Sequence, residues 1–92
     1  MRYNIIVKPD FENDIKKHIK SGNKKLVVKV SQFMSELKEH PRTGTGKPEQ
    51  LKGHNEEVWS RRIDSKHRLV YEIQEQELIV IAISAYDHYG DK

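Results

Sequence analysis

An apolar stripe between Leu26 and Leu37 constrains the fold more than any other feature of the sequence. Its members recur at helical spacing and are Leu26, Val27, Val30, Phe33, Met34 and Leu37. One face of this helix is therefore apolar and needs a second layer of structure to cover it. The helix must end near His40, because Pro41 disfavours helical backbone in the residue before it.

A strand and a shorter helix are predicted before this segment. Residues 3–8 (YNIIVK) are rich in strand formers and stop at Pro9. Asp10 is expected to cap a helix from Phe11 to about Lys20, whose acids come early and lysines late, as the helix dipole favours. The predicted apolar face of this helix comprises Phe11, Ile15 and Ile19. With the Ser-Gly-Asn turn that follows, the two helices predict a hairpin packed on a sheet.

Three strand patterns follow a Gly- and Pro-rich loop at 41–50. Residues 58–63 and 67–73 alternate between two sides, which is typical of strands with one buried face. Residues 78–83 (LIVIAI) are apolar on both sides and predict a central strand. The expected fold is therefore α+β, in the order β-α-α-β-β-β, with the helical hairpin on one face of an antiparallel sheet.

Length and composition predict one domain spanning residues 1–92. A chain of 92 residues with 35% hydrophobic and 34% charged residues is globular but has a lean core. It contains no cysteine, which excludes a disulfide framework and a thiolate zinc site. The apolar run near the N-terminus is too short for a signal sequence or a membrane span, so a cytoplasmic setting without membrane association is expected.

The positive charge of the chain gathers in its middle third. Eight Lys and Arg residues stand against five acids between Lys38 and Arg68. An ordinary mixed surface is one interpretation and a polyanion site is the other, favoured by the aromatic Trp59 within the cluster. Trp59 itself is expected to be core rather than a stacking platform. The candidate RNA-binding residues are Lys47, Lys52, Arg61 and Arg62.

Cleaving RNA without a metal needs a base, a cation for the phosphate and an acid. Glu49, between Lys47 and Lys52, is the candidate base, and His88 is the candidate acid. Arg68 interrupts an otherwise apolar strand, and Tyr89 could stack on a nucleobase. Taken singly, each of these residues also fits an ordinary surface position. No cofactor and no metal is expected. The remaining histidines are interpreted as surface residues: His18, His40, His54 and His67.

The separated motifs GKPEQLKG, VWSRRI, HRLVY and DHY together resemble the YoeB/Txe branch of the RelE superfamily of bacterial type II toxins. Specific matches cover roughly residues 41–89. The resemblance implies a RelE-like fold and a metal-independent endoribonuclease, an mRNA interferase that cuts mRNA on the ribosome. It also implies a cognate acidic antitoxin (YefM/Axe-like) and leaves a homodimer open.

The resemblance also implies roles for individual residues. Glu49 falls on the general base, Arg68 on the phosphate clamp, His88 on the general acid and Tyr89 on a substrate-positioning residue. The chain departs from the family pattern in the run Ser84-Ala85-Tyr86-Asp87 before His88, and in the tail Gly90-Asp91-Lys92. Two other functions stay open: a non-catalytic RNA- or ribosome-binding translation inhibitor, and a ParE-like gyrase toxin.

Strand geometry raises one conflict within this site. If the last turn closes around Glu75-Gln76, Arg68 lies opposite Ile83, on the side away from Leu69. In a regular strand His88 would then lie on the side opposite to Arg68. The strand must therefore break, bulge or end around residues 86–87 for the two side chains to meet.

Overall fold

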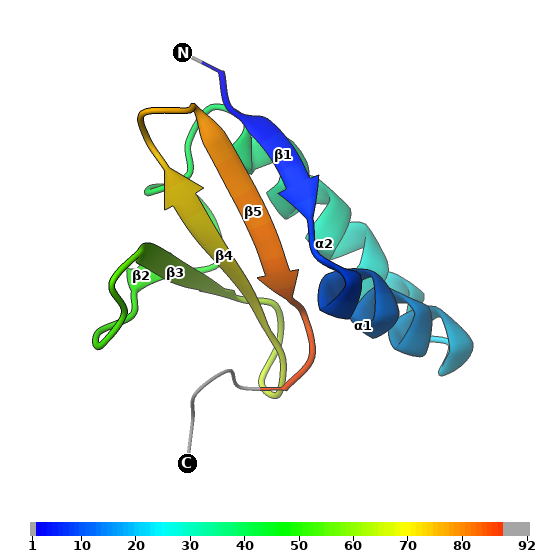
Figure 1. The fold of residues 1–92 in the computed structure, drawn as a ribbon. Coiled ribbons are helices and arrows are strands. Elements are labelled where there is room, and N and C mark those ends of the chain that lie inside the picture. The colour runs from blue at the N-terminus through cyan, green and yellow to red at the C-terminus, as the bar shows by residue number, and fades with distance from the viewer. Residues whose placement is uncertain (1, 88–92) are drawn as a thin grey trace.

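The computed structural model describes residues 2–87, which form a helical hairpin packed on one sheet (Figure 1). Within this range the elements are β1 (Asn4–Val7), α1 (Pro9–Lys20), α2 (Lys24–Leu37), β2 (Glu49–Gln50), β3 (Glu57–Arg62), β4 (Arg68–Gln74) and β5 (Ile79–Ser84). The predicted α+β class is confirmed. The structure adds β2, a short strand that pairs with β3. No helix among the described residues is long and apolar enough to cross a membrane.

The sheet has the strand order β1-β5-β4-β3-β2. Strand β5 lies between β1 and β4 (Figure 1), so its predicted central position is confirmed. The expectation of a purely antiparallel sheet is wrong for one pair, because β1 runs parallel to β5. Local turn signals do not reveal this pair, since the two strands lie at opposite ends of the sequence.

The turn between β4 and β5 sets a different register from the predicted one. It occupies residues 75–78, and Leu78 at its end has a positive φ of 54°. Tyr71 consequently pairs with Ala82, whereas a turn closed around residues 75–76 would pair it with Val80.

A β-bulge after Val70 shifts the register again, so that Val70 pairs with Ser84. Arg68 therefore does not lie opposite Ile83. Its backbone N–H instead donates to the carbonyl of Asp87 at 3.1 Å, beyond the end of β5. The interruption that the sequence required near residues 86–87 is the end of β5 at Ser84, and the bulge on β4 is an irregularity that was not predicted.

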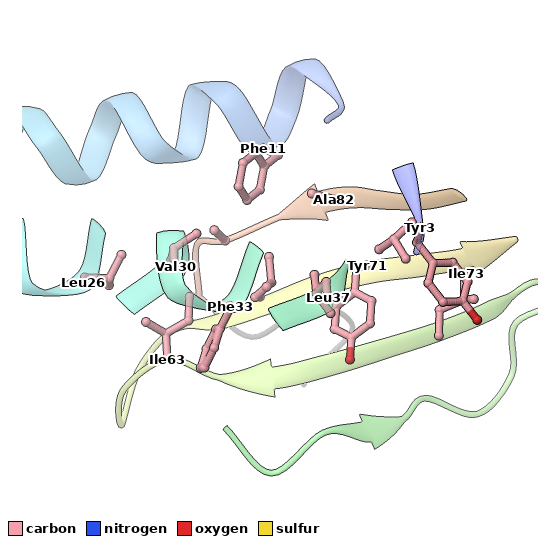
Figure 2. Packing of buried hydrophobic residues seen from close by; sticks show 13 residues of the cluster. Tyr3, Phe11, Leu26, Val30, Phe33, Leu37, Ile63, Tyr71, Ile73 and Ala82 are labelled. Carbon is pink, nitrogen blue, oxygen red and sulfur yellow. The ribbon is translucent and has the colours of Figure 1, made fainter. Parts of the chain in front are cut away.

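The apolar stripe of α2 is confirmed as the centre of the core. Its side chains pack against the sheet in Figure 2, and the buried members are Leu26, Val30, Phe33 and Leu37. Asn23 caps this helix, because its side-chain oxygen accepts a hydrogen bond from the N–H of Leu26. From the sheet, Tyr71 and Ile73 of β4 and Val80 and Ala82 of β5 complete the layer.

Helix α1 ends at Lys20 as predicted, but its start and its buried face differ from the prediction. It begins at Pro9, so Asp10 lies in the first turn instead of capping the helix. Ile19, expected on the buried face, is 60% exposed. Phe11 is buried as predicted, but the polar side chains of Asp14 and His18 are buried beside it.

Candidate active site

Strands β2, β3 and β4 bring Glu49 and Arg68 onto the same face of the sheet. Glu49 pairs with Ser60, and Arg68 pairs with Arg62. Ser60 and Arg62 share one side of β3, because side chains alternate along a strand. Arg61 between them points to the opposite side, where it contacts Glu36 of α2. The face that carries Glu49 and Arg68 is therefore the one turned away from the helical hairpin.

The guanidinium of Arg68 lies close to both Glu49 and Ser60. Its Nη1 is 3.8 Å from Oε1 of Glu49 and donates to Oγ of Ser60 at 3.4 Å. The side chain of Arg68 is 23% exposed, whereas that of Glu49 is 69% exposed. An ion pair so open to water contributes only about 0–1 kcal/mol to folding. What the pair offers is chemistry: a carboxylate that can accept a proton beside a cation that can bind phosphate.

Three of the predicted RNA-binding cations are exposed around Glu49: Lys47, Lys52 and Arg62. Lys47 and Lys52 flank β2. The carbonyl of Gly46 accepts a hydrogen bond from the backbone N–H of Arg62 at 2.7 Å, which ties the start of this segment to β3. The three cations are therefore exposed on or next to the two strands, β2 and β3, that support Glu49, and such a surface suits a polyanion.

Arg61 is fully buried, which corrects the expectation that it contacts RNA. Its Nε donates to the hydroxyl of Tyr71 at 3.2 Å, and its two terminal nitrogens bind the Glu36 carboxylate and three backbone carbonyls, those of His40, Thr43 and Thr45. Desolvation acts to raise the pKa of Glu36, but hydrogen bonds from Thr45 and Arg61 lower it overall. Arg61 therefore holds the loop that precedes β2 through hydrogen bonds to its backbone carbonyls.

Trp59 packs against the core, as predicted. Its indole N–H donates to Oε2 of Glu57 at 2.8 Å, and the same carboxylate binds the guanidinium of Arg42. The hydrogen bonds from Arg42 lower the pKa of Glu57 and keep it ionised. The ion pair between Glu57 and Arg42 thus holds the indole of Trp59 in place.

His88 and Tyr89, the predicted acid and substrate-positioning residue, lie outside the described residues. The chain just before them is described and ends at Asp87, whose carbonyl accepts the hydrogen bond from the Arg68 backbone N–H. The backbone therefore reaches Arg68 immediately before the position of His88 in the sequence.

Two histidines interpreted as surface residues are buried, which corrects that interpretation. His18 is 2% exposed and His67 is 7% exposed, whereas His40 and His54 are exposed as expected. Asp14 is buried beside His18. The signal that sequence reasoning missed is their spacing, since residues 14 and 18 share the helix face that also carries Phe11.

Small bacterial toxins share this fold. The structure superposes on the YoeB/ParE toxin from Agrobacterium tumefaciens with a TM-score of 0.84 and 29% identity, over 94% of this chain and 99% of that one. It also superposes on Staphylococcus aureus YoeB, solved as a dimer (TM-score 0.80, 32% identity, 97% and 100% of the two chains). A YoeB from S. aureus has also been solved in a YoeB–YefM complex, and the structure superposes on it with a TM-score of 0.77 and 33% identity, over 97% and 100% of the two chains. The protein therefore belongs to the class of toxins from bacterial toxin–antitoxin systems.

Sequence comparison narrows this class. The family described as "YoeB-like toxin of bacterial type II toxin-antitoxin system" matches residues 8–89. The toxin YoeB of Streptomyces coelicolor is 36% identical over 72 residues, which cover 78% of this chain and 83% of that protein. The toxin YoeB of a Synechocystis strain is 41% identical over 61 residues, covering 66% and 71%. The chain belongs to the YoeB family of type II toxins.

Proposed function

We propose that this toxin is a ribosome-dependent mRNA endonuclease that inhibits translation. The observation that carries the proposal is the approach of Arg68 Nη1 to Glu49 Oε1, 3.8 Å, on a sheet face flanked by exposed cations. A base and a phosphate-binding group side by side are what attack by a ribose 2′-hydroxyl requires.

In the proposed mechanism Glu49 removes the proton from a ribose 2′-hydroxyl, and the 2′-oxygen attacks the adjacent phosphorus. Arg68 stabilises the negative charge that develops on the non-bridging oxygens. The bond from phosphorus to the 5′-oxygen then breaks, and His88 gives that oxygen a proton. The products are a 2′,3′-cyclic phosphate and a free 5′-hydroxyl. Tyr89 positions the substrate, while the RNA backbone is held by Lys47, Lys52 and Arg62.

Replacing the base tests the mechanism directly. We expect Glu49→Gln to slow cleavage of mRNA on purified programmed ribosomes by about 10²–10⁴-fold, the usual contribution of a general base. Glu56→Gln is the matched control, because Glu56 is also an exposed carboxylate but lies in the connection between β2 and β3. If Glu49→Gln cleaves mRNA as fast as this control, Glu49 is not the general base.

Two other functions make different predictions. A toxin that blocks translation by occupancy needs no base, so it would arrest growth without new mRNA 5′ ends after brief induction, and Glu49→Gln would stay toxic. A ParE-like gyrase toxin would inhibit supercoiling by purified gyrase. We expect new mRNA ends in the coding region and unchanged supercoiling.

The proposed partners follow from the charge of the same surface. We propose that an acidic antitoxin segment folds over the exposed cations Lys47, Lys52 and Arg62. The S. aureus relatives support this proposal and also a homodimer, since one YoeB structure is a YoeB–YefM complex and another is a dimer. The Tm of the toxin should rise when the product of the adjacent gene is added. An unchanged Tm would argue against the antitoxin.

A further inference from the structure

Three buried polar side chains lie away from Glu49 and take no part in the proposed chemistry. They are Asp14 and His18 of α1 and His67, which directly precedes β4; all are less than one-tenth exposed, at 8%, 2% and 7%. Burying polar groups is costly unless each finds a hydrogen-bond partner. The partners of these three side chains therefore indicate what the cluster is for.

All three partners belong to one short segment of backbone. Oδ2 of Asp14 accepts the N–H of Ala85 at 2.9 Å, and Nε2 of His18 contacts the carbonyl of Ala85 at 2.8 Å. Nδ1 of His67 accepts the N–H of Asp87 at 2.8 Å. With the bond from the Arg68 N–H to the Asp87 carbonyl, every backbone hydrogen-bonding group of residues 85 and 87 is held.

The residue between them is held by its ring. Tyr86 stacks on His18 with ring centroids 5.1 Å apart and tilts against His67 at 4.7 Å. The ammonium group of Lys17 lies 4.8 Å from the centroid of the same ring. Side chains from α1 and from the β3–β4 turn therefore contact three consecutive residues, 85–87.

These bonds assign the hydrogen-bonding role of one ring nitrogen in each histidine. A carbonyl can only accept, so His18 must carry its proton on Nε2. The N–H of Asp87 can only donate, so Nδ1 of His67 must be unprotonated. Burial lowers the pKa of His67, which favours the neutral ring that this bond requires. Oδ1 of Asp64 accepts the N–H of His67 at 2.7 Å and holds the turn that presents the ring.

We propose that Asp14, His18 and His67, here called the terminal clamp, are positioning residues for the reaction. The proposal rests on the endonuclease function above. The clamp fixes the backbone up to Asp87 beside Arg68, and His88 is the next residue in the chain. It thereby fixes the backbone of the residue that directly precedes His88 in the sequence. Misplacing a catalytic group by about 1 Å can cost roughly 10²-fold in rate.

Isosteric pairs of variants separate positioning from packing. His67→Leu fills the site without an acceptor, whereas the amide oxygen of His67→Asn lies near the position of Nδ1. His18→Met and His18→Gln form the corresponding pair for the donor at Nε2. Val30→Ala removes buried volume from α2, a helix that carries no clamp residue, and serves as the control for lost stability.

The assay is single-turnover and steady-state cleavage of mRNA on programmed ribosomes, with Tm measured for each variant. We expect His67→Leu to lower kcat at least tenfold while KM for the ribosome stays within about twofold of wild type, since His67 does not touch the RNA. His67→Asn should recover most of the lost kcat, and Val30→Ala should lower Tm without a comparable loss of kcat.

Three results would overturn the proposal. One is full kcat in both His67→Leu and His18→Met. Another is an equal loss in the Leu and Asn variants, which would mean that the hydrogen bond is irrelevant. The third is a loss that only follows Tm, as in Val30→Ala. Wild-type protein that leaves mRNA intact would instead refute the endonuclease function itself and the positioning role with it.

Discussion

Adjacent arginines on β3 give the sharpest test of the fold. Arg61 is fully buried, whereas its neighbour Arg62 is exposed. We predict that Arg61→Met strongly destabilises the toxin and that Arg62→Met does not. Both changes remove a guanidinium and leave an unbranched side chain, so the pair isolates the effect of position.

The magnitude follows from what each guanidinium binds. Arg61 donates to Glu36, to Tyr71 and to three loop carbonyls. Removing one partner of a buried charged network costs about 3–5 kcal/mol. The side chain of Glu36 is 26% exposed and can be rehydrated, so the lower end of that range applies. A loss of about 3 kcal/mol lowers Tm by roughly 12–24 °C in a chain of this size. Arg62→Met should stay within about 0.5 kcal/mol of wild type.

The assay is urea unfolding followed by Trp59 fluorescence, in a Glu49→Gln background, which should relieve growth arrest if Glu49 is the proposed base. Arg61→Lys adds information, because it keeps the charge but not the planar fork, and should recover only part of the loss. If Arg61→Met and Arg62→Met unfold at the same urea concentration, the assignment of Arg61 as the anchor of residues 40–45 is refuted.

Three further predictions concern other parts of the molecule. Burial lowers the pKa of His67, so below pH about 6.5 this histidine binds a proton in the unfolded chain more readily than in the folded protein. The free energy of unfolding should therefore fall as pH drops from 8 to 5, with a shallower slope in His67→Asn. Gly46→Ala should destabilise by more than Gly22→Ala in urea unfolding, because both have positive φ but only at Gly46 would the added Cβ lie 2.6 Å from Cζ of Phe33. Lys52→Gln should weaken ribosome binding and reduce by about one the slope of log affinity against log salt, while Tm stays unchanged.

The elements that local patterns specify are predictable from this sequence. The stripe of α2 has a single helical period, and Leu26 and Leu37 are buried as that period requires. Residues 78–83 are apolar on both sides and form a strand with neighbours on both edges. In both cases the information is contained within one segment, and no distant residue is needed to interpret it.

The failures share a different cause, which is that the deciding partner lies far away in the chain. Asp14 and His18 lie on the same helix face as Phe11, but the backbone groups of residue 85 that satisfy them when buried are far away in the chain. Alternation along β3 shows that Arg61 and Arg62 face opposite sides. It does not show which one is buried, because that choice depends on carbonyls of the loop at 40–45. Pairing of β1 with β5 is non-local in the same way.

The candidate site combines both kinds of information. Motifs in the sequence identify Glu49 and Arg68, but their 3.8 Å approach depends on the registers of β2 with β3 and of β3 with β4. A shift of one residue in either register would turn one of the two side chains to the other face of the sheet. The motifs therefore predict the chemistry, while strand pairing supplies the geometry.

Strand β3 joins the buried side of the molecule to the candidate site. On its inner side Arg61 fastens residues 40–45, and the next segment is tied to the same strand where Arg62 N–H donates to the Gly46 carbonyl. Only three residues further on, Glu49 pairs with Ser60. Glu49 thus lies on a segment whose preceding loop is held by the buried guanidinium of Arg61. Its carboxylate is exposed, but the backbone that carries it is held by hydrogen bonds. Loss of Arg61 should therefore weaken catalysis through Glu49 as well as stability, whereas loss of Arg62 should weaken RNA binding alone.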